Sequence, residues 1–188
     1  KSRPVPVRPV ETTGLAWGTT LSAMVDAMVP MATANTRVVQ ILGGVGAPDA
    51  PEYGAELVRR LARQLEAQAV LLPAPGIVAT TAVRDVLSKD KHVRAALDEL
   101  DALDIVFVGL GSLASNAVLN DGHTLSRQAR KELQTRRAVG DIALRFFDDR
   151  GAPVLTGLDD RMLGMPTEQL RKGGGGVAGE GGRTSTRV

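Results

Sequence analysis

Short glycine-rich segments recur along this 188-residue chain, where apolar runs end or where helices are expected to begin. In an open sheet of parallel strands, ligands bind at the carboxyl ends of the strands, where such segments gather. Glycine lets the backbone approach a ligand closely, and the free N–H groups of a helix N-terminus attract phosphate. The pattern therefore predicts a site for a phosphorylated or polyhydroxylated small molecule, built from Gly14–Thr20, Gly43–Gly46, Gly109–Ser112 and Gly140–Asp141.

Apolar periodicity predicts strands and helices that alternate along the chain, which favours an α/β fold with a mostly parallel sheet flanked by helices. Thr19 or Thr20 is expected to cap the first helix, and Ser126 is expected to cap a later polar one. The predicted strands are 14–17, 38–42, 69–72, 105–108 and 142–147, the last leading into a hairpin turn at 148–151. The predicted helices are 19–28, 52–68, 79–87, 93–103, 126–137 and 166–172.

The length suits one domain, and the composition changes at both of its ends. Residues 1–13 contain prolines at positions 4, 6 and 9 and are expected to form an extended lead-in. Residues 14–172 hold all the predicted strands and helices. Residues 173–188 begin with four consecutive glycines, a composition that is expected to bury no core of its own.

Composition also excludes several classes of function. Aromatic residues make up only 3% of the chain, which argues against the base stacking that single-stranded nucleic acids need, and the net charge of +2 is small and dispersed. There is no cysteine, and His92 and His123 are not spaced as metal ligands, so neither a metal nor a cofactor is predicted. No apolar run reaches the roughly 18 residues of a membrane span. No membrane partner is therefore predicted, and a cytoplasmic location is expected.

The first two glycine segments each allow a functional and a simpler interpretation. Gly18–Thr20 opens a helix, where two hydroxyls and free N–H groups can hold phosphate or sugar oxygens, or simply cap the helix. The residues alone favour neither interpretation. Gly43–Gly46 follows a buried strand without the spacing of a dinucleotide fingerprint. A tight turn is the favoured interpretation there, and a longer loop that covers a site is the alternative.

The later segments add polar groups but no visible catalytic machinery. Gly111 and Ser112 come off a strand end and supply N–H groups and a hydroxyl. Asp141 can accept hydrogen bonds from a sugar or act as a general base, or it can be an exposed acid at a strand start. The pair Asp159-Asp160 is expected to be a solvated loop or an ion-pair partner of Arg161 rather than a cation site. No nucleophile lies beside a base in sequence.

Six stretches, in their order along the chain, resemble the sugar-binding effector domain of SorC/DeoR-type bacterial transcriptional regulators. The resemblance implies a fold like that of the sugar-phosphate isomerases and glucosamine-6-phosphate deaminase. It also implies a phosphorylated sugar as ligand, with residues 14–172 as the effector domain. The matching stretches are GLAWGTTL (14–21), VVQILGGVG (38–46), LLPAP (71–75), DIVFVGLGS (104–112), AVGDIALRFFDDRG (138–151) and LDDRMLGMPTEQLRK (158–172).

The resemblance also implies which residues meet the ligand. The family has a lysine after a V-A-G-G turn near its C-terminus, and the corresponding position here is Arg183. Arginine keeps the positive charge but forms no Schiff base, so covalent capture of an aldehyde sugar is not expected. The implied ligand-binding set is Gly18, Thr19, Thr20, Gly43, Gly44, Gly46, Gly111, Ser112, Asp141 and Arg183.

The leading hypothesis is therefore a non-enzymatic effector-sensing domain, which controls operator binding by an N-terminal helix-turn-helix that this chain lacks. A sugar-phosphate isomerase or deaminase on the same fold is the alternative, and a structural or dimerisation fragment without a ligand is a third. A homo-oligomer, dimer or tetramer, is expected, with the helix at 79–87 and the segment around Met162, Leu163 and Met165 as its contact surface.

Overall fold

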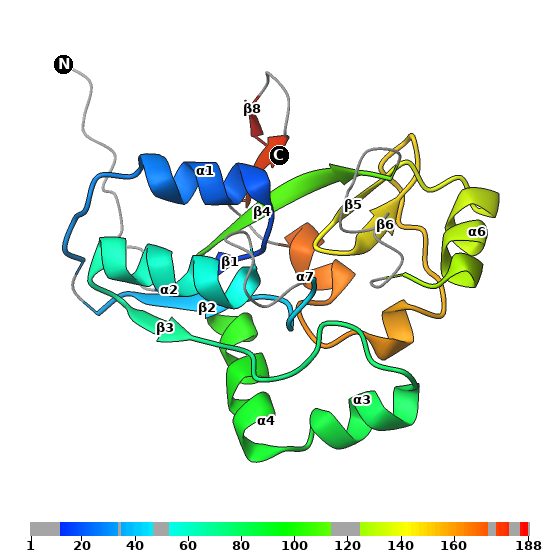
Figure 1. Cartoon of the computed structure of the whole chain (residues 1–188), viewed down its shortest axis with the longest axis horizontal. Coiled ribbons are helices and arrows are strands. Elements are labelled where there is room, and N and C mark those ends of the chain that lie inside the picture. Colours follow the sequence, from blue (N-terminus) through cyan, green and yellow to red (C-terminus); the bar gives the residue numbers. More distant parts are fainter. Residues whose placement is uncertain are drawn as a thin grey trace.

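The computed structural model describes residues 12–33, 35–46, 53–113, 125–172, 176–180 and 185–187. These residues form an α/β fold around one mixed, mostly parallel sheet, as the sequence predicts (Figure 1). The strand order is β3-β2-β1-β4-β5-β6, and β7 pairs with both β4 and β8. The strands are β1 Thr12–Leu15, β2 Arg37–Gln40, β3 Gln68–Val70, β4 Ile105–Ser112, β5 Gly140–Ile142, β6 Arg145–Phe147, β7 Gly176–Glu180 and β8 Ser185–Arg187.

The strands β1, β2, β3, β4 and β7 run parallel to one another, while β5, β6 and β8 are antiparallel to their neighbours. Gly14 of β1 lies between Val39 of β2 and Val106 of β4. Val38 and Val39 are fully buried because the parallel sheet is covered on both faces. The predicted apolar strands at 38–42, 69–72 and 105–108 are thereby confirmed, each with shifted ends.

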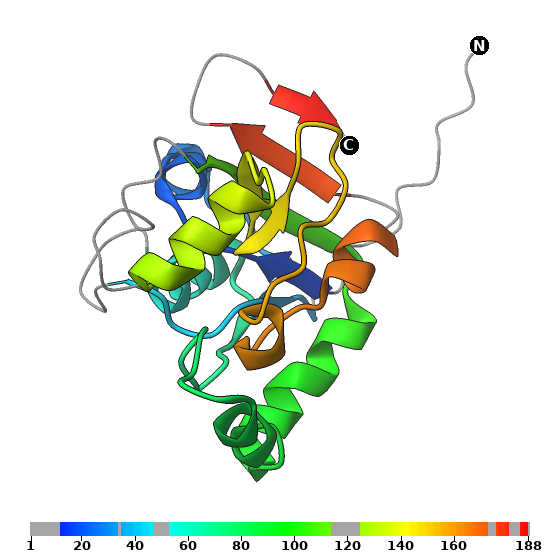
Figure 2. The same cartoon turned by 90° about the vertical axis from the view of Figure 1, so that its right-hand side faces the viewer.

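Helices cover both faces of the sheet (Figure 2). The helices α1 and α2 pack together on one side of β1 and β2. On the other side lie α4, the short 3-10 helix η1 that continues it, and α7. The bounds are α1 Thr19–Ala27, α2 Gly54–Leu65, α3 Thr81–Leu87, α4 Lys91–Asp98, η1 Glu99–Ala102, α6 Arg127–Thr135, η2 Asp159–Arg161 and α7 Thr167–Lys172.

The helix α2 shows why the spacing of apolar residues was informative. Leu57, Leu61 and Leu65 follow one another at intervals of four residues and are at most 9% exposed. Arg59 and Arg63 point outward on the opposite side. The helix ends where Glu66 adopts a left-handed conformation with φ 50°. Burial of the leucine face against the sheet supplies most of what holds α2 in place.

A second core lies beside the sheet, beneath α6. Leu133 of α6, Leu144 and Leu158 are buried in it, and Trp17 and Leu42 connect it to the carboxyl ends of β1 and β2. The predicted cap of α6 is confirmed, because the Ser126 hydroxyl accepts a hydrogen bond from the Ala129 amide at 3.1 Å. The predicted threonine cap of α1 is wrong, since Gly18 occupies that position and no side chain caps the helix.

The strand predicted at 142–147 is wrong, because the chain reverses in its middle. Ala143 and Leu144 both take left-handed φ values, 49° and 63°, and connect β5 to β6 in a tight hairpin. These left-handed backbone conformations are unfavourable for residues other than glycine, and two contacts offset the strain. Leu144 is fully buried, and its amide donates to Asp141 Oδ2 at 3.0 Å. The hairpin turn predicted at 148–151 is present, with Gly151 N donating to Asp148 O.

Two glycine-rich segments, 109–112 and 173–188, contain β-strand. Gly109 and Gly111 continue β4 as far as Ser112, and this extension pairs with β5 and β7. The C-terminal segment 173–188 contains β7, whose residues 176–180 run parallel to β4. A neighbouring strand supplies the hydrogen bonds that a glycine-rich segment cannot find alone. The chain also enters the sheet at Thr12, two residues before the strand expected at 14–17.

A short segment after η2 crosses beneath the end of β2 and fixes its direction. Met165 N donates to Ile41 O at 2.7 Å, and Gly43 N donates to Leu163 O at 2.9 Å. The side chains of Leu163 and Met165 are 1% and 6% exposed, and Met162 is buried with them. The prediction that these three residues form a contact surface between subunits is therefore wrong.

Gly164→Ala tests the close approach in this crossing. Gly164 has φ 154°, and a Cβ there would lie 2.6 Å from Ile41 O and 2.8 Å from Leu42 Cα. Because both atoms belong to backbone, we expect a loss of about 3 kcal/mol in the free energy of unfolding. Gly157→Ala is the matched control, since a Cβ there meets nothing within 4 Å. Chemical denaturation checks both variants, and equal stabilities would contradict the role of the crossing.

Candidate functional site

The carboxyl ends of the parallel strands form the edge at which the predicted site residues gather. Ile41 N donates to Leu15 O at 3.2 Å and Ala16 N donates to Phe107 O at 3.0 Å, so the ladder continues one residue beyond β1 and β2. The chain then leaves β1 through Trp17 to α1 and leaves β2 through Leu42 to Gly43. Sheet pairing thus brings together segments that are far apart in sequence.

The N-terminus of α1 is an open helix end at this edge. The first intrahelical bond runs from Ser22 N to Gly18 O at 2.9 Å, which leaves the preceding amides of the helix without a partner inside it. Gly18 has φ 130°, and within the described structure nothing lies within 4 Å of the position of its missing Cβ. Thr19 is exposed and Thr20 is half-buried at this helix end.

Trp17, directly before this helix, carries a polar atom without a partner. Its side chain packs against both cores, and its indole N–H is buried without an acceptor in the part of the chain that the structure describes. A buried donor without an acceptor costs free energy of folding. This donor is therefore an exception to the general satisfaction of buried polar groups, at the same edge of the sheet as the open helix end.

The loop after β2 is braced by backbone hydrogen bonds. Gly44 N donates to Ala74 O at 2.9 Å, and Gly76 N donates to Gly44 O at 2.8 Å, which joins this loop to the one after β3. Gly43 and Gly44 lack the Cβ atoms that would meet Pro75 backbone and the Tyr53 hydroxyl. Leu42 and Gly44 form isolated bridges with Gly164 and Pro75, so the chain here is extended and the favoured interpretation of a tight turn is wrong. Gly46, with φ 81°, is exposed at the end of the described part of the loop.

Gln40 is a site-positioning residue that sequence reasoning missed. Its side chain is 2% exposed; its Nε2 donates to Leu42 O at 2.7 Å and its Oε1 accepts from Leu72 N at 3.3 Å. It therefore holds together the loops after β2 and β3. The available signal was a single polar residue inside the apolar run 38–42. Tyr53, which covers Gly44, was missed as well, because its contact depends on the fold.

The residues predicted on β4 and β5 are brought together as cross-strand partners. Gly111 lies opposite Asp141, and Ser112 lies opposite Gly140. A Cβ at Gly140 would lie 2.5 Å from Gly111 O, so the glycines permit close pairing of these strands. Asp141 is 3% exposed and accepts the Leu144 amide, which gives its carboxylate a structural role in the hairpin turn. Ser112 is exposed.

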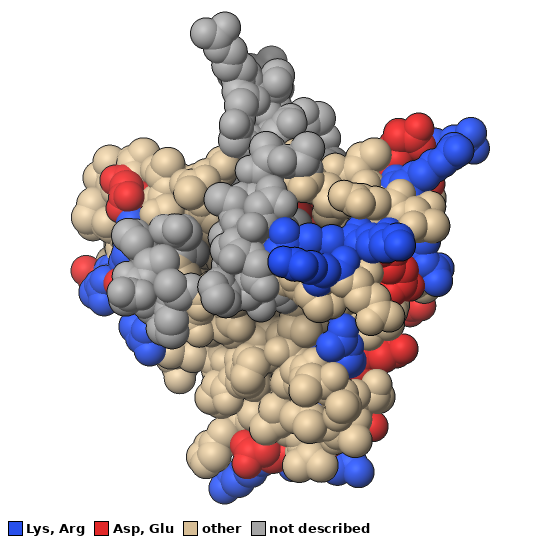
Figure 3. Space-filling view, turned by 45° about the vertical axis from the view of Figure 1, so that its right-hand side comes forward, with Lys and Arg blue, Asp and Glu red and all other residues tan. Residues whose placement is uncertain are grey.

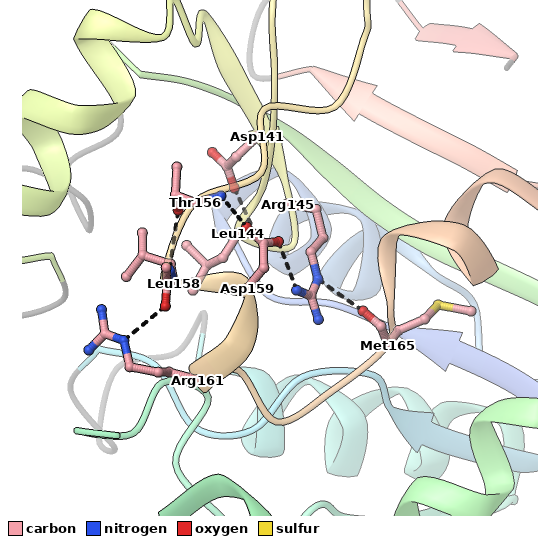
Figure 4. Close-up of polar contacts among 9 residues, drawn as sticks. Asp141, Leu144, Arg145, Thr156, Leu158, Asp159, Arg161 and Met165 are labelled. Carbon is pink, nitrogen blue, oxygen red and sulfur yellow. Dashed lines mark hydrogen bonds and ion pairs between the residues drawn. The ribbon is translucent and has the colours of Figure 1, made fainter. Parts of the chain in front are cut away.

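An ion pair ties this hairpin to η2, and a hydrogen bond ties it to the segment after η2 (Figure 4). Arg145 NH1 lies 3.1 Å from Asp159 Oδ1, while its Nε donates to Met165 O at 3.1 Å. The other carboxylate oxygen of Asp159 accepts the Thr156 amide at 2.8 Å. Burial lowers the pKa of Arg145, and the neighbouring Asp159 carboxylate counteracts that effect. Asp159 and Asp160, expected to be a solvated loop or an ion-pair partner of Arg161, begin η2. Within the described residues neither forms an ion pair with Arg161, whose Nε donates to Gly157 O.

Three further predictions concern groups outside this edge. Arg183 lies outside the described residues. Among the residues that the structure describes, no group of three or more histidine or acidic side chains is arranged to hold a metal ion. No helix in the described parts of the chain is both long enough and apolar enough to cross a membrane.

The fold and this edge define a small-ligand-binding α/β domain, and comparison with known proteins identifies its family. Residues 6–182 match the family described as "Putative sugar-binding domain". Because the match spans most of the chain, the chain belongs to this family of sugar-binding domains.

Its relatives are bacterial transcriptional regulators. The chain is 27% identical to the deoxyribonucleoside regulator of Bacillus subtilis over 88% of its own length and 52% of that protein. It is 32% identical to the uncharacterised transcriptional regulator YjhU of Escherichia coli, over 85% of its length and 48% of that protein. The chain thus spans about half the length of the curated relatives it matches.

Solved structures confirm the fold. The full-length sorbitol operon regulator SorC from Klebsiella pneumoniae superimposes with a TM-score of 0.84 at 23% identity, covering 92% of this chain and 56% of that protein. A transcriptional regulator from Streptococcus pneumoniae gives the same TM-score at 23% identity, covering 93% of this chain and 66% of that one. The predicted resemblance to SorC/DeoR-type sugar-binding domains, with their isomerase-like fold, is confirmed.

A double-mutant cycle tests the buried ion pair. The Arg145 and Asp159 side chains are only 9% and 18% exposed, so removal of one charge leaves the other poorly solvated. We expect Arg145→Met to lower the free energy of unfolding by about 3 kcal/mol, and the cycle with Asp159→Asn to give a coupling above about 1 kcal/mol. The exposed pair Arg94–Asp98 is the control and is expected to show little coupling. Equal couplings would contradict the proposed tie.

Proposed function

We propose that this domain senses a phosphorylated sugar at the carboxyl edge of its sheet. The observation that carries the proposal is the open N-terminus of α1 at Gly18, Thr19 and Thr20, where the first amides of the helix have no partner inside it. Aligned peptide dipoles give such a helix end a partial positive charge, which favours a phosphate dianion. Because no side chain of the described residues caps the helix, that position is proposed for a ligand group.

The surroundings of α1 support a ligand that combines phosphate with hydroxyl groups. The space beside Gly18 is open in the described structure, so a ligand can approach its backbone closely. Backbone hydrogen bonds and the Gln40 side chain join the loops after β2 and β3, and so hold their backbone groups in position. In this proposal the sugar contacts come from the Gly43–Gly46 loop and from the end of β4 at Gly111 and Ser112. Arg183 is the proposed cationic contact from the C-terminal segment.

We infer that the domain regulates rather than catalyses. An isomerase or deaminase needs an acid or base to move a proton between adjacent carbons. Asp141, the carboxylate proposed for that task, is buried and holds the hairpin turn. The named relatives are transcriptional regulators about twice as long as the matched region. The remainder of such a regulator would read the operator, in the cytoplasm, under control of the sugar phosphate bound here.

Thermal shift measurements with paired ligands test the phosphate site. Sugar phosphates should raise the melting temperature more than the same sugars without phosphate, because only the dianion uses the α1 N-terminus. The double variant Thr19→Val/Thr20→Val should lose most of that difference while it keeps the melting temperature of the free domain. Thr81→Val is the matched control, since Thr81 is the exposed first residue of α3.

The outcomes separate the candidate functions. Equal shifts in melting temperature with phosphorylated and unphosphorylated sugars would show that the α1 N-terminus does not bind phosphate. Unchanged binding by the double variant would place the ligand elsewhere. Turnover of a bound sugar phosphate would favour the isomerase or deaminase alternative.

We propose further that the domain self-associates through α3. None of its residues is buried, and the apolar side chains of Val83 and Val86 are 43% and 70% exposed. Sedimentation at micromolar concentration should show dimers or larger species whose proportion changes with sugar phosphate. Val83→Lys/Val86→Lys should shift the population toward monomer. A strict monomer in all conditions, or no effect of the variant, would contradict this surface.

A further inference from the structure

The helix α6 carries positively charged side chains near its N-terminus, where they destabilise a helix. Arg127, Arg130 and Lys131 occupy its N-terminal half, and no acidic residue lies in its first turn. The partial positive charge of a helix N-terminus repels cations. Arg127 and Lys131 are also four residues apart, a spacing at which like charges destabilise a helix. The arrangement therefore has no explanation in the stability of α6.

Arg127 and Lys131 lie on the exposed side of α6. Ala129 and Leu133 form the buried face of α6, so Arg127 and Lys131 lie on the opposite, exposed side, with Arg130 at its border. Within the described residues neither Arg127 nor Lys131 forms an ion pair, in contrast to the arginines of α2 and α4. Figure 3, which turns the α6 side of the molecule forward, shows lysine and arginine side chains gathered on this face.

The shape of the surface decides which anion it fits. A small anion needs a concave site with converging donors. The exposed side of α6 is instead the outer side of a helix, which carries its cations at helical spacing. A repeating polyanion satisfies several such charges at once, because each contact releases a condensed counterion. We propose that the α6 face, defined as Arg127, Arg130 and Lys131, binds the phosphate backbone of duplex DNA without reading its sequence.

This inference rests on the proposed function in one respect. If the domain is part of a DNA-binding regulator, DNA lies within its reach. The two proposals fail separately, since DNA binding is measured without any sugar. Because the α6 face offers only charge contacts to phosphate, we expect weak binding that is equal for unrelated sequences. Phosphate contacts hold a domain against DNA without specifying bases.

Anisotropy titrations with a short labelled duplex of arbitrary sequence test the α6 face. The chain should bind at about 50 mM salt and lose affinity steeply toward about 200 mM. Arg127→Gln/Lys131→Gln should weaken binding and flatten the slope of log K against log salt by about 0.9 for each phosphate contact removed. Arg130 is retained in this variant because its Nε donates to Leu125 O.

The matched control is Arg63→Gln/Arg94→Gln, which removes the same net charge from two side chains that are each 66% exposed. It should leave the salt slope unchanged. No binding by the parent chain, or equal weakening by both variants, would overturn the proposal. If the α6 variant alters sedimentation and not DNA binding, the face contacts a second copy of the chain and the DNA assignment is wrong.

Arg127→Glu separates binding from folding. The substitution removes the like-charge pair and places an acid in the first turn of α6, so the melting temperature should rise by about 1–4 °C. DNA affinity should fall at the same time. A destabilised variant would show that Arg127 supports the fold, and a stabilised variant with full DNA affinity would overturn the proposal.

Discussion

The backbone crossing between residues 163–165 and the end of β2 is the constraint on which the rest of the structure depends. Two hydrogen bonds, Met165 N to Ile41 O and Gly43 N to Leu163 O, hold the segments so close that only glycine fits at position 164. The crossing directs β2 into the Gly43–Gly46 loop. Further backbone bonds and the Gln40 amide then join that loop to the one after β3. These contacts together position the loops of the candidate site.

The side of the domain around the β5–β6 hairpin is tied by buried polar contacts, whereas the side around the α1 N-terminus is open. Arg145 ties β6 to η2 through Asp159 and to the segment after η2 through Met165 O, and the buried hairpin turn packs in the second core. On the open side, the α1 N-terminus has free amides, and the Trp17 indole N–H has no acceptor in the described structure. Rigid loops around unsatisfied donors suit recognition of a small polar ligand, because little ordering is left to be done on binding.

Local sequence predicted those elements whose pattern is repeated and buried. Leucines spaced by four residues gave α2 correctly, and apolar β-branched runs predicted β2 and β4. Prediction failed where a distant partner decides the conformation. The Ala143-Leu144 turn lacks glycine and forms because Leu144 fills the second core and Asp141 accepts its amide. The glycine-rich residues 176–180 form a strand because β4 offers an unpaired edge.

The sequence by itself determined the α/β alternation, the family and the clustering of glycine segments at one edge of the sheet, because these follow from local periodicity and short motifs. Only the tertiary structure decided what each polar group does there. Asp141, expected to meet a sugar, accepts the Leu144 amide in a turn, and Gln40, not singled out, joins two loops. A side chain's partners depend on residues tens of positions away, and burial then determines whether a polar group is used by the fold or remains for a ligand.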